Sequence, residues 1–304
     1  MVGEIVRVSL KPVTFYCEGR RINGVLSAPL GVRPAPAVIW SHGYGAYKDV
    51  LGGPLVGERL VPAGYVVLRI DHRGCGESEA SPRGRCVQGF ESVVDLVAAI
   101  SFLRGQPEVD PQRIGLIGES HGGAAALMAA ALDRRARSVV ACDAFGDGGA
   151  WLRHMWQAKR GSEVYDQLLQ RAEDSAGEEA LTGSPRHVPV PEVIPYGEAD
   201  LRLFYQLCEE HPLWSREASL ATVQSLGWLV PLALAERLAT RPVRLIHGEK
   251  DETVPVEEAQ ALHRAISGSD LRVLPGIGHG VSFSEKGGEV LDLIQDWFDR
   301  TLTA

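Results

Sequence analysis

Short apolar segments alternate with amphipathic ones in the first half of the chain. Residues 37–40, 65–70 and 113–117 are rich in β-branched side chains and are bounded by Gly, Pro or Asp, which is the pattern of strands buried on both faces. Residues 93–103 and 124–132 carry apolar side chains at helical spacing. This alternation predicts an α/β fold with a mostly parallel sheet flanked by helices.

The remaining core elements are predicted from the same periodicities. Two segments, residues 14–16 and 22–27, flank the turn residues Glu18 and Gly19 and predict an antiparallel pair at the start of the chain. A strand pattern at residues 139–143 ends the first half. The strands and helices predicted in the last part of the chain are residues 243–247, 256–266, 271–274 and 290–298.

The alternation is interrupted between about residues 146 and 235. This segment holds four of the six tryptophans and a proline-rich stretch, and its 13 acidic and 7 basic residues give it a net charge of −6. We interpret it as a helical cap, since a long irregular connection, the alternative, is uncommon inside a compact domain unless it is functional. The predicted domains are an α/β core of residues 1–145 and 236–304 and a cap of residues 146–235.

Composition and charge restrict the class of protein. The formal net charge of −8 argues against nucleic acid as a partner, which requires clustered basic residues. Five widely spaced cysteines without a C-x-x-C pair indicate neither a disulfide framework nor a zinc site, and favour a reducing compartment. The first residues do not have the pattern of a secretory signal, and no apolar run reaches the roughly 18 residues of a membrane helix. We therefore expect a cytoplasmic protein without a membrane partner.

The strongest chemical signal is the pentapeptide Gly-Glu-Ser-His-Gly at residues 118–122, which matches G-x-S-x-G. It directly follows the predicted strand at 113–117 and precedes a predicted helix, as the motif requires. A tight turn there would project the hydroxyl of Ser120 from the carboxyl edge of the sheet, where a helix N-terminus favours negative charge. We predict that Ser120 is a nucleophile; the alternative is a serine that only caps the helix.

A serine nucleophile needs a base, and the base needs a third group that fixes its tautomer. Asp251 lies in the loop after one predicted core strand, and His279 lies in a glycine-rich loop after the next. Both loops belong to the same sheet edge as Ser120, in the order Ser, acid, His. We therefore predict His279 as general base and Asp251 as its acid. Asp143, which ends the preceding core strand, is a rival acid, and either loop residue could have an ordinary turn role.

These motifs together resemble the α/β-hydrolase superfamily, most closely serine esterases and acyl-peptidase-like hydrolases with an inserted cap. The resemblance covers about residues 13–145 and 236–304 and rests on the motifs at residues 41–44, 71–78, 118–122, 248–251 and 278–279. It implies an oxyanion hole formed by the backbone N–H groups of Tyr44 and His121, which would stabilise the charge that develops on the substrate carbonyl oxygen. Neither a cofactor nor a metal is expected, since no H-E-x-x-H or similar ligand spacing is present.

The predicted reaction is hydrolysis of a carboxylic ester through an acyl-enzyme. The same residues could act on an amide, a thioester or a carbon–carbon bond next to a carbonyl, and a binding protein of the same fold without activity is a further alternative. We expect a small-molecule substrate, apolar or aromatic if the cap tryptophans line its cavity, although tryptophans also serve as anchors between helices. The cap tryptophans are Trp151, Trp156, Trp214 and Trp228. The oligomeric state is not predicted.

Overall fold

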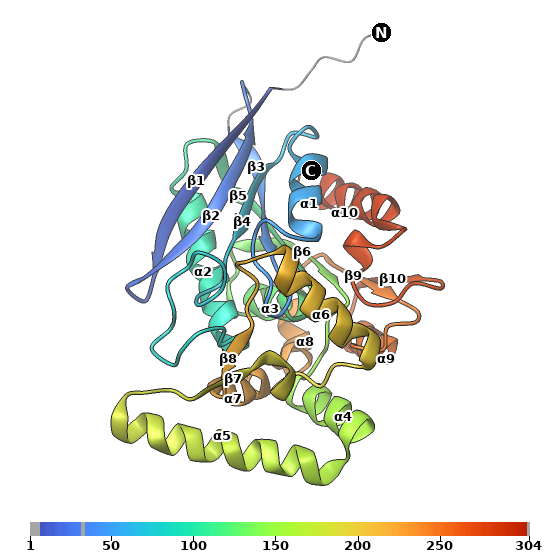
Figure 1. Ribbon diagram of the computed structural model, residues 1–304. Helices are drawn as coiled ribbons and strands as arrows, with labels where there is room; N and C mark the ends of the chain where they lie inside the picture. Colours follow the sequence, from blue (N-terminus) through green and yellow to red (C-terminus); the bar gives the residue numbers. More distant parts are fainter. Residues whose placement is uncertain (1–6, 32–33, 303–304) are drawn as a thin grey trace.

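The computed structural model describes residues 7–31 and 34–302, and its centre is an eight-stranded sheet (Figure 1). The strands of this sheet are β1 (Val8–Cys17), β2 (Arg20–Pro29), β3 (Ala35–Ser41), β4 (Val66–Ile70), β5 (Val109–Glu119), β6 (Ala136–Cys142), β9 (Val243–Gly248) and β10 (Asp270–Leu274). Their order is β1-β2-β4-β3-β5-β6-β9-β10. β2 pairs antiparallel with β1 and β4, and every other neighbouring pair is parallel. The prediction of a mostly parallel sheet is confirmed.

Different helices cover the two faces of this sheet. The helices of the core are α1 (Gly52–Leu60), α2 (Phe90–Arg104), α3 (His121–Leu132), α9 (Val256–Ala265) and α10 (Gly287–Thr301). Alternate residues of β3 point to opposite faces: Ile39 packs in the cluster with α2, α3 and α9, whereas Val38 and Trp40 pack with α1 and α10. Both faces of the central strands are therefore dry, which accounts for their continuous apolar pattern.

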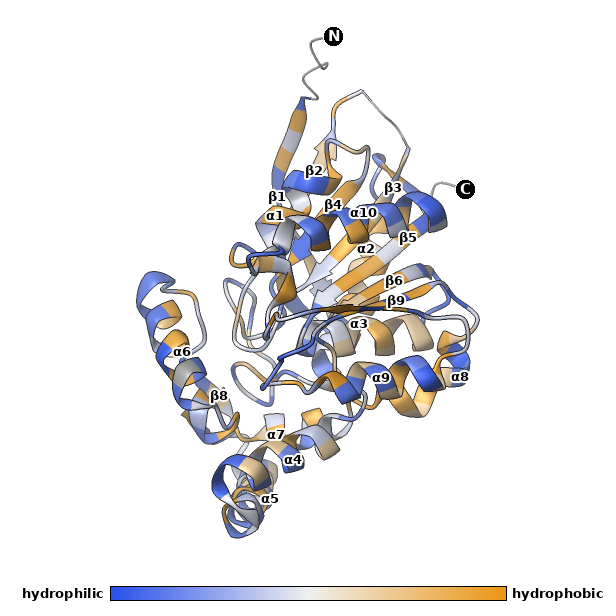
Figure 2. Cartoon of the chain, turned by 90° about the vertical axis from the view of Figure 1, so that its right-hand side faces the viewer, coloured by the Kyte–Doolittle hydropathy of each residue, from blue (hydrophilic) through white to orange (hydrophobic). Residues whose placement is uncertain are grey.

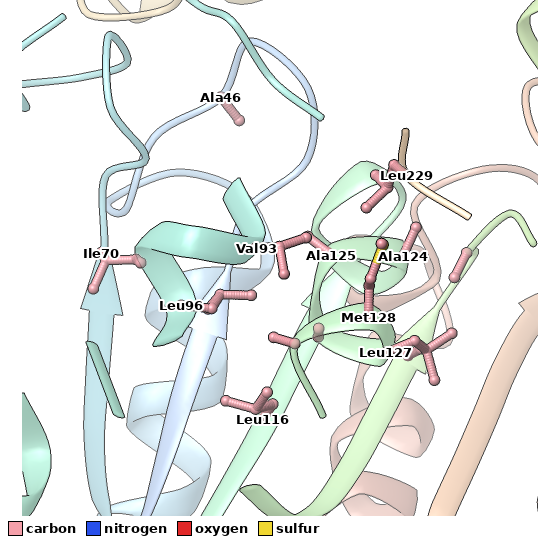
Figure 3. Packing of buried hydrophobic residues seen from close by; sticks show 14 of the residues in the cluster. Ala46, Ile70, Val93, Leu96, Leu116, Ala124, Ala125, Leu127, Met128 and Leu229 are labelled. Carbon is pink, nitrogen blue, oxygen red and sulfur yellow. The ribbon is translucent and has the colours of Figure 1, made fainter. Parts of the chain in front are cut away.

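Helix α3, which follows Ser120, is buried on all sides. All of its residues from His121 to Ala131 are buried, and most of them are alanine or glycine, so neighbouring backbones approach it closely. Figure 3 shows Ala125 of α3 close to Val93 of α2. Because every face of α3 is packed, the turn at its N-terminus has a rigid support.

The cap segment, residues 146–235, leaves the sheet after β6 and returns before β9. Its helices are α4 (Gly148–Arg160), α5 (Ser162–Thr182), η1 (Val190–Glu192), α6 (Glu198–Glu210), α7 (Ala221–Gly227), η2 (Pro231–Leu234) and α8 (Ala235–Leu238). The structure differs from the expected all-helical cap in a short antiparallel pair, β7 (His187–Pro189) with β8 (Glu217–Ser219). Helix α8 begins at Ala235, the last residue of the predicted cap, and continues into the predicted core.

The cap helices lie beyond one edge of the sheet. Figure 1 shows α5 furthest from the sheet, along the bottom of the view, and Figure 2 shows α6 to one side of the core with hydrophilic and hydrophobic residues along it. Within the described part of the chain, no helix combines the length and the hydrophobicity that crossing a membrane requires.

Candidate active site

Ser120 lies in a strained turn between β5 and α3. Its φ of 56° and ψ of −124° place a residue with a side chain in a region that mainly glycine occupies. The two flanking glycines are required by close backbone approach, because a Cβ at Gly118 would collide with the main chain of Gly122, and one at Gly122 with the carbonyl oxygen of Ser41. The G-x-S-x-G pattern thus has a steric cause.

Three side chains from separate loops form one chain of hydrogen bonds. His279 Nε2 is 3.0 Å from Ser120 Oγ, and His279 Nδ1 is 2.6 Å from Asp251 Oδ2. The second carboxylate oxygen of Asp251 accepts the backbone N–H groups of Thr253 and Val254, at 2.8 and 2.7 Å. An ionised carboxylate fixed in this way holds the Nδ1–H tautomer, leaving Nε2 free to accept the serine proton. The structure brings together the three residues predicted from the sequence.

Asp143, the rival acid, has a different position. It directly follows β6. Its carboxylate accepts hydrogen bonds from the backbone N–H groups of Gly248 at 3.1 Å, Gly280 at 2.8 Å and Val281 at 2.9 Å. It therefore fastens the loop after β9 to the loop that contains His279. The imidazole Nδ1–H of His279 donates to Asp251 and not to Asp143.

Glu119, which sequence reasoning passed over, is a second carboxyl group buried behind the site. It is 4% exposed and accepts hydrogen bonds from the hydroxyl and the N–H of Ser282. Burial raises the pKa of Glu119 to about 7, and the nearby Asp143 carboxylate adds to this shift. The available signal was a glutamate just after a predicted buried strand and next to the nucleophile, because a buried carboxyl group needs a partner.

The buried carboxylates make His279 a strong base. Burial disfavours the imidazolium, but Asp251, then Asp143 and Glu119, outweigh burial and raise the pKa of His279 to about 9. Burial likewise favours protonation of Asp251, yet His279 and His247 hold the pKa of Asp251 well below its usual range. The site is therefore arranged to receive a proton on His279 while Asp251 stays ionised.

The two predicted oxyanion donors belong to segments that lie next to Ser120. A Cβ at Gly43 would lie 3.7 Å from Ser120 Cβ, which places the backbone that leads into Tyr44 beside the nucleophile. His121 is the first residue of α3, so its N–H has no acceptor within the helix and lies at the positive end of the helix dipole. The His121 ring is buried 6.2 Å from His72, and burial, together with His72, lowers the pKa of His121 to about 3, so the ring is neutral.

A cavity of about 150 Å³ opens above Ser120 and His279. Most of its lining is apolar, with Trp40, Val50 and Leu51 from the core. The cap residues that line it are Trp151, Ile194, Tyr196, Asp200, Leu203, Phe204, Leu207, Trp214 and Leu226. Such a lining receives an apolar group next to a reacting carbonyl.

The four cap tryptophans divide between the two roles left open by the sequence: two line the cavity and two do not. Trp151 and Trp214 line it. Trp156 is buried within the cap segment, where its indole N–H donates to the carbonyl of Val193 at 2.9 Å. Trp228 is 53% exposed and lies under the Arg83 guanidinium, 5.1 Å from the ring centroid. Position along the chain did not distinguish lining residues from anchors.

One group of side chains has the spacing of a metal site. Ligand atoms of Asp143, His247 and Asp251 lie within 4.8 Å of one another. The same carboxylates already accept the backbone N–H groups and the imidazole described above, and His247 Nε2 donates to the carbonyl of Val254 at 2.7 Å. We assign this group to the hydrogen-bond network that supports His279 and derive no metal site from it.

Known proteins resemble this chain over most of its length. A family model described as serine aminopeptidase, S33, matches residues 32–286. The thiohydrolase aneE of Aspergillus aculeatus is 29% identical over 268 residues, covering 83% of this chain and 80% of that protein.

Solved structures share the fold. The hypothetical protein PA2218 from Pseudomonas aeruginosa has a TM-score of 0.81 at 25% identity, covering 97% of this chain and 94% of its own. Est1E from Butyrivibrio proteoclasticus, solved with ferulic acid, has a TM-score of 0.69 at 18% identity, covering 96% and 100%. Fold, motif positions and family match agree, and the chain belongs to the α/β-hydrolase superfamily, in the family described as serine aminopeptidase, S33.

Proposed function

We propose that the protein is a serine hydrolase that cleaves a carboxylic ester of a small molecule with an apolar acyl group, through a covalent acyl-enzyme. The observation that carries this proposal is the hydrogen-bonded chain from Ser120 through His279 to Asp251 at the floor of an apolar cavity. The core and the cap segment, both of which line the cavity, act together in this proposal: the core performs the chemistry and the cap segment selects the acyl group.

In the acylation step, Ser120 Oγ attacks the ester carbonyl carbon while His279 Nε2 takes the hydroxyl proton. The backbone N–H groups of Tyr44 and His121 stabilise the negative charge that develops on the carbonyl oxygen. His279 then donates its proton to the departing alcohol oxygen as the carbon–oxygen bond breaks. Asp251 remains ionised throughout and stabilises the imidazolium, as its lowered pKa requires.

Deacylation repeats these steps with water. His279 Nε2 takes a proton from water, the resulting hydroxide attacks the acyl carbon, and the proton returns to Ser120 Oγ as the carboxylic acid leaves. The high pKa of His279 favours both proton transfers to Nε2, provided that the imidazole is neutral before the substrate binds.

A thioester is the second candidate substrate. Two relatives are named thiohydrolases, aneE of Aspergillus aculeatus and apmlB of Arthrinium phaeospermum. Each is 29% identical to this chain, and the matches cover 83% and 88% of it. The same steps cleave a thioester. A thiol, with a pKa near 8.5, leaves with less help from a protonated His279 than an alcohol does.

Three substrates that share one acyl group but differ in the leaving group distinguish these functions. We would compare kcat/KM for octanoyl p-nitrophenyl ester, the matching thiophenyl thioester and the matching anilide, each with the wild type and Ser120→Ala. We expect the ester, the thioester or both to be hydrolysed and the anilide to be slow. A dominant anilide activity would contradict the proposal. A fluorophosphonate probe should label the wild type at Ser120; a folded protein that is neither labelled nor active would be a binding protein.

A further inference from the structure

Thr253 contacts three parts of the site at once. Its N–H donates to Asp251 Oδ1 at 2.8 Å, so it helps to hold the acid that bonds to His279. Its carbonyl oxygen accepts the indole N–H of Trp151 on α4 at 2.8 Å. Its hydroxyl donates to Asp200 Oδ2 on α6 at 3.1 Å. One residue of the core, Thr253, thus connects the catalytic acid to two cap helices.

Helix α6 forms a wall of the acyl cavity but has few attachments to the core. Leu203, Phe204 and Leu207 lie on its cavity side, close after Asp200. Within residues 7–31 and 34–302, the hydrogen bond between Thr253 and Asp200 is the one polar contact recorded between α6 and the core. The other side-chain hydrogen bonds of α6 join residues of the cap segment to each other. Apolar packing of Phe204 and Cys208 holds the body of α6, and the hydrogen bond from Thr253 fixes its first turn relative to the core.

Trp151, the second cap residue that is hydrogen-bonded to Thr253, also lines the cavity. Its ring lines the cavity and stacks on Phe145, with centroids 4.8 Å apart and planes at 5°. An acyl group that fills the cavity contacts both Trp151 and α6, and both of them are hydrogen-bonded to Thr253. Contacts with the acyl group and the placement of Asp251 therefore share one residue.

We propose that Thr253 is a positioning and specificity residue, which fastens α6 over the acyl cavity and at the same time holds Asp251 toward His279. This inference rests on the proposed function for its kinetic consequence. An acyl chain long enough to contact α6 gains from a fixed wall, whereas an acetyl group remains near Ser120 and gains little. The protein thereby favours esters or thioesters of longer apolar acids over those of short ones.

Hydrogen exchange tests the structural half of this proposal without any substrate. Thr253→Val removes the hydroxyl donor and keeps the main-chain contacts, and Asp200→Ala removes the acceptor. Both should increase amide exchange in α6, whereas Thr253→Ser should restore the wild-type rate. Thr182→Val is the matched control, because the Thr182 hydroxyl donates within α5 to the carbonyl of Glu178. Unchanged exchange in α6 of Thr253→Val would overturn the proposal, whether or not the protein is active.

Kinetics test the functional half. The ratio of kcat/KM for octanoyl over acetyl p-nitrophenyl ester should fall about 3- to 10-fold in Thr253→Val, the range expected for one net hydrogen bond. The change should lie mainly in KM for the octanoyl ester, with Thr253→Ser close to wild type. Because the two side chains act as a pair, Asp200→Ala should add little to Thr253→Val. Equal losses on both esters, or full additivity, would overturn the specificity role. A wild type inactive on every ester and thioester would refute the proposed function instead, and the exchange result would still decide the fastening role.

Discussion

The Glu119 carboxylate accepts a hydrogen bond from the hydroxyl of Ser282, three residues after His279. This contact joins the turn that carries the nucleophile to the loop that carries the base. Asp143 fastens the same loop through the N–H groups of Gly280 and Val281. Three carboxyl groups therefore surround His279, and the loop that carries it is held on two sides.

The pH dependence of activity should follow from this arrangement. His279 must be neutral to accept the Ser120 proton, and its pKa is raised to about 9, so kcat/KM should rise with pH up to that region. Glu119→Gln keeps an oxygen acceptor for Ser282 but removes a negative charge near His279. The pKa of His279 should therefore fall in this variant, and the acid limb of the kcat/KM profile should move to lower pH. Identical limbs in the two proteins would show that the Glu119 charge does not act on His279.

Removal of either reacting side chain should abolish most activity. Ser120→Ala and His279→Ala should each lower kcat on the order of 10³-fold or more, because members of such a group act as a unit. The melting temperature and circular dichroism of both variants should match a folded protein. A folded Ser120→Ala protein with full activity would contradict the mechanism.

The two aspartates should respond differently to the same substitution. Asp251→Asn should lower kcat by about 10³- to 10⁴-fold, because an amide cannot favour the required imidazole tautomer. Asp143→Asn should affect kcat less and the melting temperature more, since its oxygens accept backbone N–H groups from two loops. Parallel measurements of kcat and Tm on both variants decide this; a larger kcat loss in Asp143→Asn would reassign the acid.

Substrate preference should depend on the tryptophans that line the cavity. Trp151→Ala and Trp214→Ala should raise KM for octanoyl esters, by about 10-fold for the loss of 1 to 2 kcal/mol of apolar contact. Trp228→Ala is the matched control, because its ring lies outside the cavity under Arg83. If Trp228→Ala changed KM as much as the other two, the assigned cavity would be wrong.

Several features of the protein are determined by the sequence alone because they have local causes. Buried parallel strands need continuous apolar residues on both faces, so β3, β4 and β5 were predicted to within a few residues. The turn at Ser120 needs glycine at 118 and 122 for steric reasons, which makes the motif visible without a structure. These requirements act within one strand and the turn that follows it.

Only the tertiary structure decided which groups meet. Asp143 and Asp251 both follow core strands, so the sequence predicted Asp251 as the acid but kept Asp143 as a rival. The packing of the loops around His279 places Asp251 on Nδ1. The partners of Glu119 and Thr253, and the division of the tryptophans into lining and anchoring residues, likewise depend on segments far apart in the chain. Contacts of this kind arise from the way the loops and the cap segment pack over the sheet edge, and no local pattern of residues encodes them.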